Sequence, residues 1–185
     1  MPNWCESTLI ITGNKKDLQR FKKEAKGYKT ALSLDKLYPM PEALSFISAP
    51  ATVLSEKEYE KEIAKIKRME KKEPKNEYWK CGYPITKRMK KEYLERYGAC
   101  DWYSWRVSNW GTKWDIEAHL EREGEHSLRY CFDSAWAPPI DCFVKASVKF
   151  PHLKFNLKYE EPGMRFKGRA VVKTGELLED IYHDM

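Results

Sequence analysis

Tryptophan residues are concentrated in two short stretches that could bind a ligand. The first stretch, residues 102–115, ends in Asn-Trp-Gly-Thr-Lys-Trp-Asp, and the second, residues 134–139, reads Ser-Ala-Trp-Ala-Pro-Pro. Flat indole rings beside hydrogen-bonding groups and a cation suit stacking on bases or anchoring of a peptide. The candidate binding residues are Trp4, Asn109, Trp110, Thr112, Lys113, Trp114 and Trp136.

The same residues also suit a structural role. Gly111 could take a positive φ in a turn, Asn109 could bond to nearby backbone, and the tryptophans could wedge a sheet against its loops. Large aromatic side chains are often found in protein cores. The sequence leaves both interpretations open.

Carboxylates near the tryptophan stretches are the candidates for catalysis. Asp101, Asp115, Asp133 and Asp141 could converge and serve acid–base work or a metal, although Asp141 also suits the first turn of a helix. The chain has no phosphate-binding, dinucleotide-binding, metalloprotease or nucleophile-elbow motif. We therefore predict no catalytic residue and keep an enzyme as the alternative.

The cysteines and histidines predict neither a metal site nor a cofactor. Five cysteines are scattered without a C-x-x-C pair, and four histidines are equally dispersed. Free thiols in a reducing compartment fit this spacing better than disulfides or structural zinc. His119 and Cys131 could meet across neighbouring strands, an arrangement more typical of packing than of metal binding. The cysteines are Cys5, Cys81, Cys100, Cys131 and Cys142.

The charge of the chain permits a nucleic-acid partner without requiring one. The net charge is +6, but glutamates are interspersed among the lysines and dilute the positive field. The sequence string typical of RNA-recognition motifs is missing. We therefore expect a protein partner, with electrostatic binding of nucleic acid as an alternative. The residues of that alternative are Lys87, Arg88, Lys90, Lys91, Arg165, Lys167 and Arg169.

Apolar residues are frequent but never form a long run. They make up 42% of the chain, which predicts a packed globular protein, and no stretch is long enough to cross a bilayer. The first residues lack the basic and apolar regions of a secretory signal. We expect a cytoplasmic protein without a membrane association, either a monomer or a weak homodimer.

Residue periodicity predicts an alternating order of strands and helices. Extended segments are expected at 3–12, 103–107, 116–120, 128–132 and 153–160, with a hairpin at 166–181 and an extended arm at 32–41. Helices are expected at 14–27 and after Pro139. Two amphipathic, charged helices are expected within an insertion at about 55–97, one begun by Ser55 and Glu58 and the other by Thr86.

Without the insertion, this order is the βαββαβ plan of the ferredoxin-like fold, an α+β architecture with an antiparallel sheet. The prediction is one ferredoxin-like domain over residues 1–185, carrying the two-helix insertion at about 55–97 and a C-terminal hairpin.

Four phrases resemble the YubB and Api-ninety-two-like proteins. They are Pro-Asn-Trp-Cys at 2–5, Asn-Trp-Gly-Thr-Lys-Trp-Asp at 109–115, Phe-Asp-Ser-Ala-Trp-Ala-Pro-Pro at 132–139, and Tyr-Glu-Glu-Pro-Gly-Met with Phe-Lys-Gly at 159–168. The resemblance implies a ferredoxin-like domain carried by bacterial mobile elements such as phages, plasmids and genomic islands. It implies no known reaction, and it does not extend to the helical insertion. We expect a binding module that serves as an accessory protein of such an element.

Overall fold

A computed structural model of the chain describes residues 3–72 and 82–185. Contacts between residues divide the chain into two compact units. The first unit comprises Met1–Pro39 and Ser108–Met185, and the second comprises Met40–Val107. The insertion predicted at about 55–97 lies within the second unit, and the prediction of a single domain stays a prediction.

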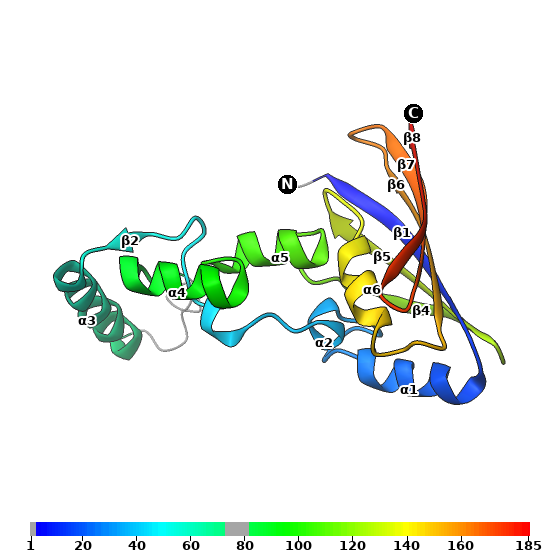
Figure 1. Cartoon of the computed structure of the whole chain (residues 1–185), viewed down its shortest axis with the longest axis horizontal. Coiled ribbons are helices and arrows are strands. Elements are labelled where there is room, and N and C mark those ends of the chain that lie inside the picture. The colour runs from blue at the N-terminus through cyan, green and yellow to red at the C-terminus, as the bar shows by residue number, and fades with distance from the viewer. Residues whose placement is uncertain (1–2, 73–81) are drawn as a thin grey trace. The chain divides into compact units, whose positions relative to one another are not determined.

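The first unit is built on a six-stranded sheet in the order β4-β5-β1-β6-β7-β8. Every neighbouring pair of strands in this sheet is antiparallel. The central strand β1 therefore pairs with β5 on one side and with β6 on the other (Figure 1). The strands are β1 (Trp4–Thr12), β4 (His119–Glu123), β5 (Ser127–Ala135), β6 (Lys154–Glu161), β7 (Phe166–Lys173) and β8 (Glu176–Asp184).

Three helices of the first unit, α1 (Lys15–Ala25), α2 (Leu34–Leu37) and α6 (Ile140–Ser147), pack together on one side of the sheet (Figure 1). The order β1-α1-β4-β5-α6-β6 is the βαββαβ plan, and β7 and β8 extend it by a hairpin. The predicted ferredoxin-like α+β fold with a C-terminal hairpin is confirmed.

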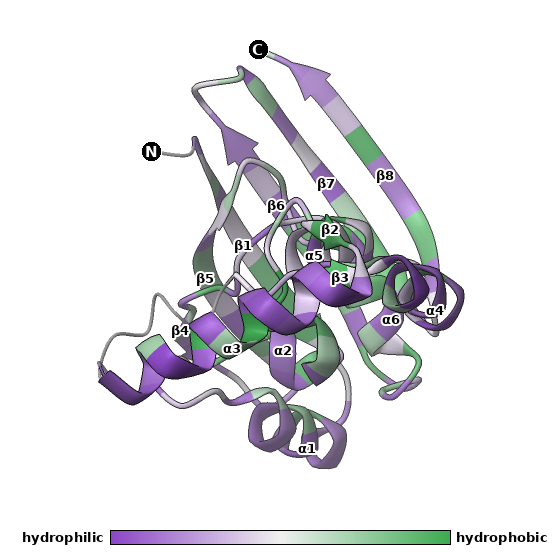
Figure 2. Ribbon diagram, turned by 90° about the vertical axis from the view of Figure 1, so that its left-hand side faces the viewer, coloured by the Kyte–Doolittle hydropathy of each residue, from purple (hydrophilic) through white to green (hydrophobic). Residues whose placement is uncertain are grey.

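Side chains that alternate along each strand separate the two faces of this sheet. Leu9 on β1 and Phe155 on β6 are fully buried, and the ring of Phe21 from α1 meets Phe155 edge-on at 5.6 Å between centroids. Hydrophilic residues occupy the intervening positions, as the alternating colours along the strands show (Figure 2). The face away from the helices is therefore polar and open to solvent over β1, β5 and β6.

The second unit contains the two predicted helices of the insertion. The helix α3 (Glu56–Lys72) begins at Ser55, whose hydroxyl donates to Glu58 Oε2 at 2.6 Å. The helix α4 (Lys87–Tyr97) begins at Thr86 and ends at Gly98, which has a φ of 71°. Each helix is preceded by a short strand, and these strands, β2 (Val53–Leu54) and β3 (Ile85–Thr86), form a parallel pair. Both capping predictions are confirmed.

The strand predicted at 103–107 is wrong, because residues Trp102–Trp110 form the helix α5. The helix starts at Asp101, whose carboxylate accepts hydrogen bonds from the backbone N–H and the hydroxyl of Ser104. Trp105 is buried, as is Trp110 at the end of the helix. The apparent two-residue alternation over this stretch concealed a capped helix with buried aromatics.

Two further boundaries differ from the sequence-based expectations. The predicted arm at 32–41 contains α2, because Ser33 caps a short turn by accepting from the N–H of Lys36. The strand predicted at 116–120 begins only at His119, and Ala118 instead pairs with the loop after α1, accepting from the N–H of Ala31. No helix within the described residues is long and apolar enough to cross a membrane.

Candidate binding site at the tryptophan cluster

Segments from three of the four sequence phrases are joined at the beginning of β1. The backbone N–H of Trp136 donates to the carbonyl oxygen of Asn3 at 2.9 Å. The hydroxyl of Thr112 donates to the carbonyl oxygen of Ala135 at 2.9 Å. The fourth phrase reaches the same place, because a methyl group on Gly163 would lie 2.9 Å from the side-chain nitrogen of Asn3. The fold therefore collects these phrases at one end of the sheet.

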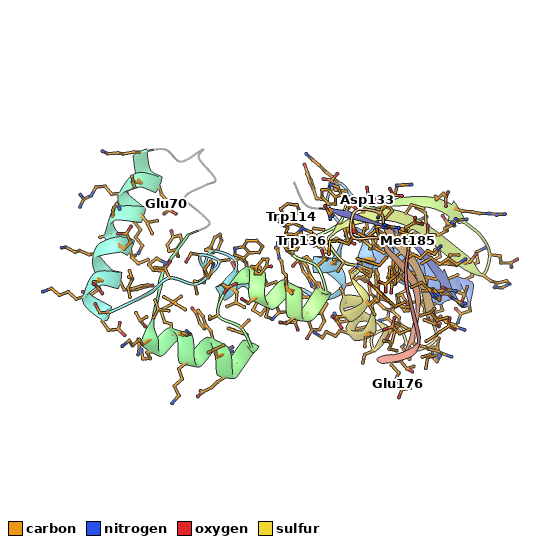
Figure 3. The ribbon with its side chains drawn as sticks, turned by 90° about the horizontal axis from the view of Figure 1, so that it is seen from above. Glu70, Trp114, Asp133, Trp136, Glu176 and Met185 are labelled. Atoms are coloured by element: carbon orange, nitrogen blue, oxygen red, sulfur yellow. The ribbon has the colours of Figure 1, made fainter. Side chains whose placement is uncertain are left out.

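Three tryptophans at this end expose much of their side chains, and a lysine lies over the rings of two of them. The exposed fractions are 46% for Trp4, 39% for Trp114 and 44% for Trp136. Lys113 Nζ lies 3.7 Å from the ring centroid of Trp136 and 4.0 Å from that of Trp114. The ring of Trp4 lies 6.0 Å from that of Trp114. We call these four residues the tryptophan cluster, and Figure 3 shows Trp114 and Trp136 lying together.

The backbone of Trp136 adopts a conformation that bulky residues rarely take. Its φ is 71°, in the left-handed region, where a side chain crowds its own backbone. The bond from Trp136 N–H to Asn3 holds this geometry, together with a bond from the Ser134 hydroxyl to the carbonyl oxygen of Ala137 at 2.8 Å. Conformations of this kind are frequent at functional sites. Here the strained backbone presents an aromatic ring to solvent.

The other predicted binding residues support the structure. Trp110 is fully buried, and its indole N–H donates to the carbonyl oxygen of Tyr38 at 2.8 Å. Thr112 is buried as well. Asn109 accepts a hydrogen bond from Lys145 Nζ at 2.7 Å. Of the seven candidates, these three therefore hold the turn in place, and the tryptophan cluster provides the accessible surface.

Lys145 also explains how the end of α5 is stabilised. Its ammonium group lies 3.4 Å from the carbonyl oxygens of both Ser108 and Asn109, where the helix dipole attracts a cation. Partial burial lowers the pKa of Lys145, while nearby Asp141 raises it. The lysine thus stabilises the last turn of α5.

Two carboxylates of the enzyme alternative act as helix caps. Asp115 accepts hydrogen bonds from the Ser33 hydroxyl and the Leu34 N–H, each at 2.6 Å, and thereby fixes the start of α2. Asp101 is buried and caps α5. Asp133 is exposed on the open sheet face. Asp115 and Asp101 are therefore already engaged as hydrogen-bond acceptors at two different helix starts.

A hollow of about 460 Å³ lies on the open face of the sheet. Glu6 on β1 stands between Asp133 on β5 and Glu160 on β6, each being its direct cross-strand neighbour. Among the described residues, none of these three carboxylates has a side-chain hydrogen bond or an ion pair. Trp4 is two residues from Glu6 and projects from the same face of β1, which connects the hollow to the tryptophan cluster. The hollow is lined by Glu6, Ser7, Thr8, Glu117, His119, Cys131, Phe132, Asp133, Lys158, Tyr159 and Glu160.

Three thiols of the first unit have raised pKa values and are therefore poor nucleophiles near neutral pH. Burial raises the pKa of the Cys5 thiol to about 11, and it raises that of Cys142 further above the ordinary range. Cys131 faces His119 across β4 and β5, as the sequence suggested. Partial burial also raises the pKa of Cys131. Within residues 3–72 and 82–185, no group of three or more histidine, cysteine, aspartate or glutamate residues is arranged to hold a metal ion.

Residues 109–185, which contain three of the four phrases, match the sequence profile described as the ferredoxin-like domain in Api92-like protein. This part of the chain is similar to the ferredoxin-like domain of Api92-like proteins. A crystal structure of a protein api92 from Yersinia pseudotuberculosis has the same overall fold, with a TM-score of 0.51 over 100% of this chain and 98% of that one, at 12% identity. No functionally curated protein matches the chain.

The last of the four phrases, at 159–168, has a structural explanation. The buried carboxylate of Glu161 accepts hydrogen bonds from the N–H groups of Gly163 and Met164 and so closes the turn between β6 and β7. Any side chain on Gly168 would collide with the carbonyl oxygen of Ile181 and with Tyr159. The phrase therefore shapes the hairpin beside the site.

Sequence reasoning missed the acidic hollow on the open face of the sheet. Glu6 is visible in the sequence as an outward position of the first strand, but its neighbours depend on how the strands pair. Residues 133 and 160 come next to residue 6 only in the observed register. The alternation of polar residues along each strand was the available signal, and it identified the face without identifying the cluster.

Proposed function

We propose that this chain is a binding module without enzymatic activity, a cytoplasmic accessory protein of a bacterial mobile element that recognises a protein partner through the tryptophan cluster. The observation that carries the proposal is the group of three half-exposed tryptophans, one of them held with a left-handed backbone. Exposed aromatic rings at the rim of a hollow are typical anchors of protein interfaces.

The charge around the tryptophan cluster favours protein over nucleic acid. Glu6, Asp133 and Glu160 lie side by side on the adjoining sheet face. Their negative charges repel the phosphates of a nucleic-acid strand that would stack its bases on the neighbouring tryptophans. A protein segment has no such backbone charge and can approach the same surface.

Affinity capture from a bacterial lysate tests the proposal. The bait proteins are the wild type, Trp136→Gly, and Tyr28→Ala as a matched control, since Tyr28 is 95% exposed and also has a lysine beside its ring. A specific protein retained by the wild type and by Tyr28→Ala, but lost from Trp136→Gly, supports the site. A folded Trp136→Gly variant that retains every captured partner contradicts it.

The second candidate function is electrostatic binding of nucleic acid through α4. Lys87, Arg88, Lys90 and Lys91 occupy exposed positions in the first turns of α4, where the helix dipole disfavours cations. The basic residues of β7 support this function less, because Arg169 pairs with Glu179 at 3.2 Å. Titration of duplex and single-stranded probes at two salt concentrations tests it, because log K falls by ~0.9 per phosphate neutralised on duplex DNA. Absence of binding at low salt would remove this candidate.

A further inference from the structure

We propose that the tryptophan cluster selects a lysine or arginine side chain, presented by an extended segment of the protein partner that lies over the acidic hollow. The inference rests on the proposed function and names the chemistry of its ligand. Until the partner binds, Lys113 occupies the place of that cation. In the free protein, Lys113 therefore blocks the cluster to other cations.

The position of Lys113 shows which chemistry the rings accept. Its ammonium nitrogen is within 4.0 Å of the centroids of both Trp114 and Trp136. An ammonium or guanidinium group over an indole face is attracted by the negative face of the ring, and tryptophan attracts cations most strongly among aromatic residues. A cation from a partner can make the same contacts once Lys113 has rotated into solvent. Lys113 is on a half-buried turn and has a flexible stem that permits this rotation.

The acidic hollow next to the tryptophan cluster adds negative charge that complements a cationic partner. Four carboxylates line the hollow, and Lys158 and His119 are its basic lining residues. The chain as a whole has a net charge of +6, whereas carboxylates outnumber basic residues in the lining of the hollow. Asp133, Glu6 and Glu160 follow one another across three strands. A segment that extends from Trp4 along β1 to Glu6 reaches this row, and its negative charge favours basic residues in the segment.

Short peptides that differ in one side chain test the inference directly. The probes are blocked Gly-Gly-Xaa-Gly-Gly peptides in which Xaa is lysine, trimethyllysine, arginine, norleucine or the uncharged tert-butyl analogue of trimethyllysine. Binding to the full chain is followed by the indole N–H signals of Trp114 and Trp136 in nuclear magnetic resonance spectra. We expect the cationic peptides to shift both signals and the two uncharged peptides to leave them in place. Equal shifts from the trimethyllysine peptide and its uncharged analogue would overturn the inference.

Removal of the internal competitor provides the second measurement. Lys113→Ala is expected to raise the affinity for the cationic peptides about 2- to 30-fold, the range that a single cation–π contact supports. Lys29→Ala is the control, because Lys29 lies over the ring of Tyr28 in the same unit. An affinity that is unchanged or lower in Lys113→Ala would show that Lys113 belongs to the binding surface itself, and would overturn the inference.

The outcomes also separate this inference from the proposed function. If Trp136→Gly loses the captured partner but the peptides bind without regard to charge, the proposed binding site is supported and its selectivity for a cation is rejected. A preference for acidic peptides would reject it as well. Glu6→Gln is expected to lower the affinity of the chain for the lysine peptide. The fold should stay intact, since Glu6 is exposed. An unchanged affinity in Glu6→Gln would reject the contribution of the hollow.

Discussion

Trp110 donates its indole N–H to the carbonyl oxygen of Tyr38 at 2.8 Å, and the ring is fully buried. Four residues later, Trp114 exposes 39% of its side chain beside Lys113. One short sequence phrase therefore supplies both the core and the surface of this end of the sheet. The glycine between the two tryptophans, Gly111, has a φ of 83° and turns the chain from one environment to the other.

This division predicts different effects of alanine at the two tryptophans. Trp110→Ala should lower the free energy of unfolding by about 3–5 kcal/mol, because it removes a large buried side chain and leaves a cavity. Trp114→Ala should change it by less than about 1 kcal/mol, since the ring is exposed. Urea unfolding of both variants is the measurement. Similar losses for the two would show that Trp114 is also a core residue.

Asp115 is expected to stabilise the chain without contributing to binding. Asp115→Ala removes the acceptor for Ser33 and Leu34 at the start of α2 and should cost about 1–2 kcal/mol. Asp133→Asn, on the open sheet face, should stay within about 0.5 kcal/mol of the wild type. Thermal or urea unfolding compares the two. If Asp115→Ala is as stable as Asp133→Asn, the capping role is wrong.

The left-handed backbone of Trp136 predicts that glycine and alanine at this position differ in stability. Trp136→Gly should be about 1 kcal/mol more stable than Trp136→Ala, because glycine adopts a φ of 71° without a steric cost. Both variants should lose the partner, since both lack the ring. The unfolding midpoints of the two variants decide the first point. Equal stability of glycine and alanine would mean that the backbone relaxes without Trp136.

Thiol reactivity should report the burial of two cysteines. At pH 8, below the folded-state pKa of about 11, only about a thousandth of Cys5 is thiolate, and burial raises the pKa of Cys142 as well. Alkylation of the native protein, followed by mass spectrometry, should therefore leave both unmodified for as long as the chain stays folded. In urea both should react at the rate of an ordinary thiol. Rapid modification of either one in the native state would place it at the surface.

Much of the fold could be predicted from local patterns. The pairs Asn14–Asp17 and Ser55–Glu58 form side-chain hydrogen bonds at helix starts, and such caps depend on residues a few positions apart. The strand at 153–160 alternates cleanly and is present as β6. The helix α5 was missed because its cap, Asp101, precedes a stretch whose apolar residues also fit a two-residue period.

The candidate site could be predicted only in part. The tryptophan-rich phrases lie together in the structure, but the choice between core and surface within 109–115 depends on contacts with distant residues such as Tyr38. The acidic hollow depends on the register of β1 with β5 and β6. Neither a long-range contact nor a register is encoded in the spacing of nearby residues.

The most direct test of the central claim is the affinity of the purified captured partner for three forms of the chain, measured by isothermal titration calorimetry. Wild type and Tyr28→Ala should bind equally, because Tyr28 is an exposed aromatic residue outside the tryptophan cluster. Trp136→Gly, which is expected to remain folded, should bind at least about 10-fold more weakly, as loss of a hot-spot aromatic anchor costs about 2 kcal/mol or more. Equal affinities for all three forms would contradict the account.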